Sequence, residues 1–298
     1  MFKAQNMAYN AALSSSQLID MIAENIINSG TDGHKAKRWA FSDFMIGGDV
    51  VDRGVSWDQG KQEPRIGEWT KMMIRGRGLF TVKDPRSNET MYTRLGDFHL
   101  DAQGNMVTKE GYQVQGIPLE GAATALGRID PQDPDVYSKV NPGLVDPFNN
   151  PITNNATQLN PAGSPVGGTE NINLALDQRN GRYLGKFEKM YVGEDGIIYG
   201  RDGQNLVSLY KIRVVNFNNP EGLKDAKGGI FWKATEKSGL PTQGATESTV
   251  ISEAVEKSNV WLKQETHYIA GAQRAYQAAT QLHKLADKIN ATAIEMIS

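Results

Sequence analysis

The sequence contains no cysteine. A chain without thiols has no disulfide framework, no thiolate metal ligand and no thiolate nucleophile. It also lacks an excess of one charge, because 32 basic and 34 acidic side chains leave a formal net charge of −2. A chain this close to neutral carries no overall field that would attract nucleic acid or anionic lipid. The composition therefore favours proteins as partners.

Long apolar runs are also missing. No stretch of about 18 apolar residues occurs, so the sequence predicts no membrane-spanning helix. The first segment, MFKAQNMAYNAALSSSQ, lacks the continuous apolar core of a signal peptide, so we expect no cleavable Sec signal. At 298 residues, of which 39% are hydrophobic, the chain is long enough for two or three domains with a sizeable core.

Both ends of the chain carry a stripe whose positions alternate steps of four and three residues, which is typical of a coiled-coil seam. The carboxyl-terminal stripe consists of Tyr268, Ala272, Ala275, Ala279, Leu282, Ala286, Ile289, Ala293 and Met296. The amino-terminal stripe consists of Ala4, Ala8, Ala11, Ser15, Leu18, Ile22, Asn25 and Ser29, flanked by Ala12, Ile19 and Ile26. An isolated helix this polar is marginal in water. The two terminal helices are therefore expected to pack against each other or against neighbouring subunits.

From these stripes we expect a set of subunit-interface residues. It comprises all positions of the carboxyl-terminal stripe, together with Gln273, Arg274 and Tyr276 beside it, and Ala8, Ala11, Leu18, Ile22 and Asn25 at the amino end. For Gln273 and Arg274 a solvated helix face is an equal alternative. Assembly is therefore favoured over chemistry.

The middle of the chain reads as β structure. Short alternating runs separated by glycine-rich turns predict hairpins over 69–116 and 186–217. Between them, eight of the twelve prolines and several asparagine pairs predict an insertion with little regular structure. The sequence thus predicts an α+β fold. It has a terminal helical domain with coiled-coil-like pairing (1–36 and 252–298), an extended connector (37–68 and 218–251), and an all-β central domain (69–217) that includes the irregular insertion 118–186.

Candidate chemical sites are weak. His267 and His283 lie sixteen residues apart on one expected helix, so they cannot share a metal ion within one subunit. Neither phosphate-binding glycine motif is present. The run DPQDPD at 130–135 lacks the glycine and glutamate that a helix-loop-helix calcium site requires. The small basic patch around Lys37 and Arg38 has no larger basic field around it, as nucleic-acid binding would require. We therefore expect no catalytic residue, cofactor, metal, nucleic acid or small-molecule substrate.

Four separated motifs have a recognisable pattern. They occupy residues 22–28 with 31–35, then 76–80 with 92–116, then 217–223 with 238–241, and finally 256–260 with 273–276. Together they resemble the bacterial flagellar axial proteins of the hook and basal-body rod. The most specific is the second, GRGLF followed by YTRLGDF and the glycines after it. Glu24, Ile27 and His34 depart from the usual residues of that family.

The resemblance implies a structural function. The protein would be a subunit of the flagellar basal-body rod that assembles helically, with its own copies and other rod or hook proteins, into a torque-transmitting tube in the periplasm. It also implies export by the flagellar type III apparatus. Contacts of the 118–186 insertion with ring proteins around the rod are a hypothesis without motif support. In this family, hook subunits are usually longer and the most proximal rod subunits lack a central β domain. The distal rod protein typically has an extended insertion between the first helix and the β motif, which the short stretch 45–70 does not resemble, so the resemblance favours the rod subunit just below the distal one.

Two alternatives remain open. A hook or hook-like subunit would build the same kind of tube outside the cell. An extracellular β-domain enzyme or glycan-binding protein with helical ends is the alternative from a different class, because paired carboxylates for glycan chemistry are recognised only from coordinates.

Overall fold

A computed structural model describes residues 2–39, 52–119, 169–174, 176–177, 182–183, 187, 189–202, 205–243 and 248–295. The chain divides into two compact units, Met1–Gly60 with Ser258–Ser298, and Lys61–Lys257. The first unit is helical and the second is built of strands, so the chain is mostly β with one long helix at each end. None of the described helices is both long enough and apolar enough to cross a membrane.

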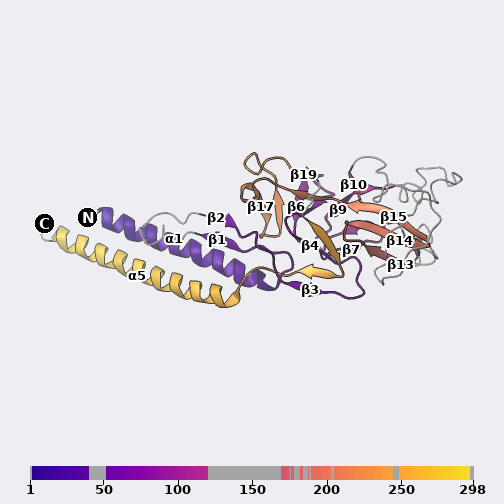
Figure 1. Ribbon diagram of the computed structural model, residues 1–298. Helices are drawn as coiled ribbons and strands as arrows, with labels where there is room; N and C mark the ends of the chain where they lie inside the picture. Colours follow the sequence, from indigo (N-terminus) through magenta and orange to yellow (C-terminus); the bar gives the residue numbers. More distant parts are fainter. Residues whose placement is uncertain are drawn as a thin grey trace. The chain divides into compact units, whose positions relative to one another are not determined.

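The helical unit consists of α1 (Phe2–Ile27), the 3-10 turn η1 (Asn28–Gly30), the strands β1 (Lys37–Trp39) and β2 (Asp52–Val55), and α5 (Leu262–Glu295). The two helices lie side by side and antiparallel, with both chain ends at the same end of the pair (Figure 1). After η1 the chain turns at Gly33, whose φ of 71° is accessible to glycine at little cost. Gly30 lies in the 3-10 turn without a positive φ, although a glycine just after a helix often takes one.

The β unit is organised around one large sheet. Its central path is β13-β14-β15-β9-β5-β6-β18-β17, and β7, β8, β10, β16 and β19 join this path. The pair β21-β3 and the pair β20-β4 are separate, and all of these pairings are antiparallel. Antiparallel neighbours along most of the path follow from the short turns that join successive strands.

The strands between residues 61 and 119 are β3 (Gln62–Pro64), β4 (Met72–Arg75), β5 (Leu79–Lys83), β6 (Thr90–Thr93), β7 (His99–Leu100), β8 (Met106–Val107) and β9 (Gln113–Pro118). The later strands are β10 (Glu170–Asn171), β11 (Leu176–Asp177), β12 (Arg182–Tyr183), β13 (Lys189–Val192), β14 (Ile197–Asp202), β15 (Asn205–Ile212) and β16 (Val214–Asn216). After the 3-10 turn η2 (Pro220–Gly222) follow β17 (Lys224–Lys227), β18 (Phe231–Lys233), β19 (Thr242–Gln243), β20 (Thr249–Ser252) and β21 (Ala254–Glu256).

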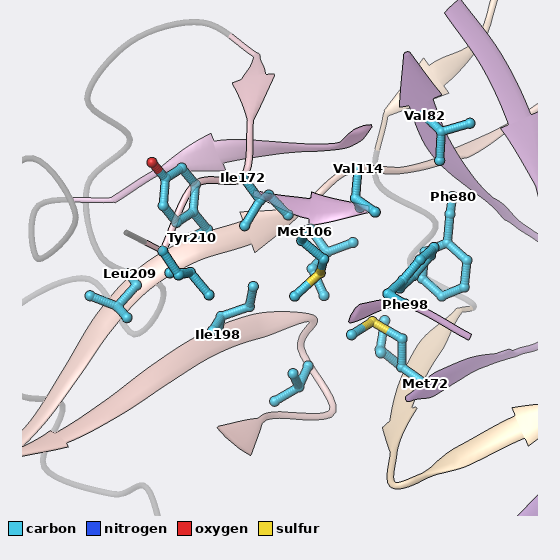
Figure 2. Packing of buried hydrophobic residues seen from close by; sticks show 14 of the residues in the cluster. Met72, Phe80, Val82, Phe98, Met106, Val114, Ile172, Ile198, Leu209 and Tyr210 are labelled. Carbon is cyan, nitrogen blue, oxygen red and sulfur yellow. The ribbon is translucent and has the colours of Figure 1, made fainter. Parts of the chain in front are cut away.

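The core of this unit is formed by alternating apolar residues from many strands. Figure 2 shows Met72, Phe80, Phe98 and Met106 packed together, with Val114, Ile172, Ile198 and Tyr210 continuing the same cluster. The rings of Phe80 and Phe98 meet edge to face, with centroids 5.2 Å apart. Tyr92, Phe98 and Val107, which the sequence places on the buried face, are buried.

Of three glycines in the hairpin motif, two have the positive φ of a tight turn and one does not. Gly104 and Gly111 have φ of 81° and 85°, as turns of this kind require. Gly96 has no positive φ. It is required by space instead, because a Cβ there would lie 1.5 Å from the carbonyl oxygen of Met72.

The boundaries within the chain differ from those expected. Residues 218–251 were expected to form a connector, yet they contain β17 and β18 of the large sheet and the pairing strands β19 and β20. Their turn-rich composition conceals short strands whose partners lie far away in sequence. The run of residues 206–217 is divided at Arg213, whose N–H donates to the carbonyl of Gln115, so that β15 pairs with β9 and β16 pairs with β5.

Most of the expected insertion 118–186 lies outside the described residues. Within it, β10 pairs with β9 and β11 pairs with β12. The expected connector 37–68 is likewise described only in part, from residue 37 to 39 and from 52 onward.

Candidate assembly interface

The two terminal helices share a small apolar core. Leu18 and Ile22 of α1 and Ala272 of α5 are fully buried against one another, with Tyr268 and Ile269 packed beside them. Small side chains dominate the rest of the contact, since Ser14, Ser15, Ala8 and Ala279 are also buried. Small residues let two helix backbones approach closely, which compensates for the modest apolar area of each side chain.

The amino-terminal stripe therefore faces α5. Ala8, Leu18, Ile22 and Asn25 are buried, and Ala11 is half-buried. On α5, Ala272 and Ala279 are buried, whereas Tyr268, Ala275 and Ala286 are half-buried. Gln273, Arg274, Tyr276, Leu282 and Ile289 are exposed in the single chain. The side chain of Ala293 and all of Met296 lie outside the described residues.

The contact departs from the expected stripe in the last turns of α5. It passes from Ala279 to His283 rather than to Leu282, since the ring of Tyr9 on α1 lies 6.3 Å from the ring of His283. Further along it reaches Asn290 rather than Ile289, because Asn290 donates to the side-chain oxygen of Gln5 at 3.2 Å. On a straight helix of 3.6 residues per turn, a strict seven-residue repeat drifts by about 20° per heptad, and an added step of four, as from Ala279 to His283, corrects this drift. Leu282 and Ile289 consequently leave the contact.

A buried polar cluster sits where α1, β1 and α5 meet. Asn25 accepts the N–H of Lys37 at 2.9 Å and donates to the carbonyl of the same residue at 3.1 Å. Glu265, in the first turn of α5, has a fully buried side chain whose oxygen lies 3.5 Å from Arg38. Burial raises the pKa of Glu265, although a hydrogen bond from Asn25 and the charge of Arg38 oppose that rise.

A second polar cluster closes the base of the helical unit. The side-chain oxygen of Asn259 accepts the N–H of Ala36 at 2.7 Å. Its amide nitrogen donates to the carbonyls of Ser56 and Asp58 at 2.8 and 3.0 Å. The ring of His34 lies 3.3 Å from the hydroxyl of Ser258. The motif at 31–35 and the motif at 256–260 therefore meet in space.

In the β unit, another pair of motifs meets at Arg94. Its guanidinium donates to the carbonyls of Ile74 and Gly76 at 3.1 and 2.7 Å, and its Nε lies 3.7 Å from a carboxylate oxygen of Glu256. Both side chains are almost fully buried. Burial lowers the pKa of Arg94, and the charge of Glu256 opposes that effect. The planar guanidinium donates to two carbonyls while it lies beside a carboxylate, as a lysine could not.

Hydrophobic side chains remain exposed on the outside of the helix pair. On α1 these are Tyr9, Leu13 and Ile27, and on α5 they are Leu282, Leu285 and Ile289, each 48% exposed or more. Contiguous exposed apolar side chains of this kind mark interaction sites. The exposed Leu285, Tyr9 and Leu13 lie off the expected stripes, and a count of every apolar residue at helical spacing would have found them.

The described residues offer no chemical site to set against this surface. No group of His, Asp and Glu among them is arranged to hold a metal ion. The acidic run 130–135, considered above for calcium, lies outside the described residues.

Comparison with known proteins finds relatives among flagellar proteins. Residues 73–200 match the family model of the flagellar hook protein FlgE/F/G D1 domain. The chain is 24% identical to the flagellar basal-body rod protein FlgG of Caulobacter vibrioides, over 91% of this chain and 90% of that protein. It is 32% identical to the flagellar hook protein FlgE of Escherichia coli, over 40% of this chain and 32% of that protein. It is 24% identical to FlgE of Brucella abortus, over 89% of this chain and 91% of that protein. In these comparisons the chain is similar to flagellar rod and hook axial proteins.

Proposed function

We propose that this chain is a structural subunit of the flagellar basal-body rod, which assembles with its own copies and with other axial proteins into a tube that transmits torque. The observation that carries the proposal is the helical unit. Its two helices bury small residues between them and leave Tyr9, Leu13, Leu282, Leu285 and Ile289 exposed. Burying a leucine contributes about 1.5–3 kcal/mol, so several half-exposed side chains on each copy provide a driving force for association.

The geometry supports a polymer better than a closed pair. The exposed residues occupy both helices, so each helix can contact a neighbouring copy. Surfaces on different sides of one subunit favour heterologous contacts, which generate filaments when the rotation does not close. The β unit has its own core and does not depend on the helices for its apolar burial.

The rod is preferred to the hook because the FlgG relative aligns over nearly the whole of both chains. The hook is the second candidate, favoured by the Brucella FlgE relative, which aligns almost as completely. The proposal includes export through the flagellar type III apparatus and a location in the periplasm. It also includes contacts between 118–186 and ring proteins around the rod, which follow only from the place of that segment in the chain.

The proposal is tested by deleting the gene and imaging the basal bodies that remain. A rod subunit predicts truncated rods and loss of motility, with both restored by the full-length chain. The chain should then persist in basal bodies from which hooks have been removed. Its loss together with the hooks would support the hook alternative, and complete basal bodies without the chain would contradict both.

A further inference from the structure

Glu265 is an acidic residue buried where three elements of the helical unit meet. It lies in the first turn of α5, and its backbone N–H donates to the carbonyl of Trp261 at 3.0 Å. Its side chain is fully buried, whereas Lys263, Gln264 and Thr266 beside it in the sequence are exposed. A glutamate is almost never fully buried unless it is paired. The partners of this carboxyl therefore decide what its charge costs.

The partners of this carboxyl are few and weak. One oxygen lies 3.5 Å from Arg38 of β1, at the outer limit of a hydrogen bond, and the side chain of Arg38 is itself 36% exposed. The other oxygen is buried and has no hydrogen-bond partner among the described residues. Asn25 of α1 favours the ionised form, but its amide also binds the backbone N–H and carbonyl of Lys37. An ionised Glu265 is therefore poorly compensated.

The other charged groups around this carboxyl do little to change that. Glu24 of α1 is bound to Lys37 of β1 at 2.8 Å, so these two charges satisfy each other. Residues 258–261, which lead into α5, carry no charge, and Lys263 and His267 of α5 are exposed. The helix dipole favours a negative charge in the first turn, so the ionised form is tolerated. Burial is nevertheless the largest influence, and it raises the pKa of this carboxyl.

Protonation of Glu265 therefore favours the docked state of α5. The neutral carboxyl brings no charge into the interior, and its O–H can donate a hydrogen bond. When the pH rises through the folded-state pKa, the group either stays charged in the interior or reaches water. Release of the first turn alone exposes it, because the apolar contact of Leu18 and Ile22 with Ala272 lies about two turns further along α5 and is kept.

We propose that Glu265 is a proton-operated latch, which holds the first turn of α5 against α1 and β1 while its carboxyl is neutral and releases that turn when the carboxyl is ionised. The latch acts within one chain, so it goes beyond the proposed function and does not depend on it. Mild acid tightens the base of the helical unit, and mild alkali loosens it.

Hydrogen exchange of the purified, unassembled full-length chain tests the latch, read by mass spectrometry on peptides that cover 262–272. Protection factors, corrected for the intrinsic pH dependence of exchange, should fall about fivefold between about pH 5 and about pH 8 in the unchanged chain. In Glu265→Gln, whose amide stays uncharged, they should remain at the acidic level throughout. The histidines titrate in both chains, so the difference between the chains isolates Glu265. Peptides covering 79–83 of the β unit should show no such difference.

Arg38→Gln provides a readout that a space-filling role for Glu265 would not move. Arg38 opposes the effect of burial, so its removal should shift the midpoint of the exchange transition to higher pH. Lys263→Gln is the matched control, because it removes an exposed positive charge from the same turn of α5 and should leave the midpoint unchanged. Circular dichroism confirms that each variant keeps its helices.

Three results would overturn the latch. The first is the same pH dependence in the unchanged chain and in Glu265→Gln. The second is a midpoint that does not respond to Arg38→Gln, which decides the question even if Glu265→Gln fails to fold. The third is no protection over 262–272 at any pH, since the docked turn would then not exist in the single chain. Because every measurement uses the unassembled chain, none of these results bears on the proposed function.

Discussion

Asn259 holds Ala36 through a 2.7 Å hydrogen bond from the backbone N–H of Ala36 to the side-chain oxygen of Asn259. The two residues lie 223 positions apart, and the same side chain also binds the carbonyls of Ser56 and Asp58. One amide therefore joins the chain before α5 to the two segments that follow α1. The side chain of Asn259 thus makes hydrogen bonds with backbone groups that, in this irregular junction, do not pair with one another.

Replacing Asn259 with alanine should remove all three bonds and leave the buried N–H of Ala36 without its acceptor, although the carbonyl of Asp58 still accepts from Lys35. The expected cost is about 2–4 kcal/mol in the free energy of unfolding of the helical unit. Thermal melting followed at 222 nm measures it. Asn10→Ala, at an exposed position of α1, is the control. Equal melting temperatures for the two variants would show that the junction is not held by this side chain.

Arg94→Lys should destabilise the β unit although the charge is kept. A lysine reaches one of the carbonyls of Ile74 and Gly76 but not both together with Glu256, so the expected cost is about 2–3 kcal/mol. Urea unfolding followed by tryptophan fluorescence measures it. Arg65→Lys is suitable for comparison, because its partner Glu63 is partly exposed. A lysine variant as stable as the unchanged protein would show that the guanidinium shape is irrelevant.

Glu265→Gln should alter how stability depends on pH. Because burial raises the folded-state pKa of Glu265, the folded chain binds its proton more tightly than the unfolded chain. The resulting contribution is fully present below the unfolded pKa and is lost as pH rises through the folded pKa. Glutamine resembles the protonated form, so the variant should lose this dependence and gain stability at pH 7 relative to pH 4.

The measurement is the difference in melting temperature between Glu265→Gln and the unchanged chain, at a series of pH values above and below the ordinary pKa of a glutamate. A difference that is constant with pH would contradict the raised pKa. Glu236→Gln, at an exposed position, is the control and should give no difference at any pH.

Gly96→Ala should be among the most damaging single changes to the β unit. The added carbon would overlap the carbonyl oxygen of Met72, and Met72 also donates its N–H to Gly96, so neither backbone segment can move freely. We expect a loss of about 3 kcal/mol in chemical unfolding. Gly271→Ala in α5 meets no atom within 4 Å and should be neutral or stabilising. A fully stable Gly96→Ala chain would show that the close approach is not required.

Leu282→Asp should abolish assembly and leave the chain folded. Leu282 is 59% exposed in the single chain, so an aspartate there stays hydrated until a neighbouring copy buries it. Filament formation and motility are measured, with Leu240→Asp as the control because that leucine is 86% exposed in the β unit. Restored motility with Leu282→Asp would remove this residue from the subunit interface.

The sequence predicts the helices and the core better than it predicts the junctions. Periodicity locates both helices and the buried face of the hairpins, because buried side chains recur at regular spacings. Examples are Leu18 and Ile22 in α1 and Phe98 and Val107 in the β unit. It misplaces the last part of the α5 contact, since Leu282 and His283 differ by one residue and only the packing of Tyr9 decides between them.

The polar clusters cannot be predicted from the sequence, for a different reason. The bonds made by Asn259 join residues more than 200 positions apart, and the pair Arg94 and Glu256 is almost as distant. No local spacing records such pairs. The short strands β17 and β18 are concealed in the same way, because their partners and not their own composition make them strands.

The central claim is that the helix pair of this chain builds a tube from many copies. Electron cryomicroscopy of purified basal bodies from cells that carry the chain tests it most directly. The account predicts density in the rod for α1 and α5 of successive copies, with each pair in contact with its neighbours through its exposed side chains. Finding the chain only as a monomer, with both helices touching no other subunit and no density in rod or hook, would contradict it.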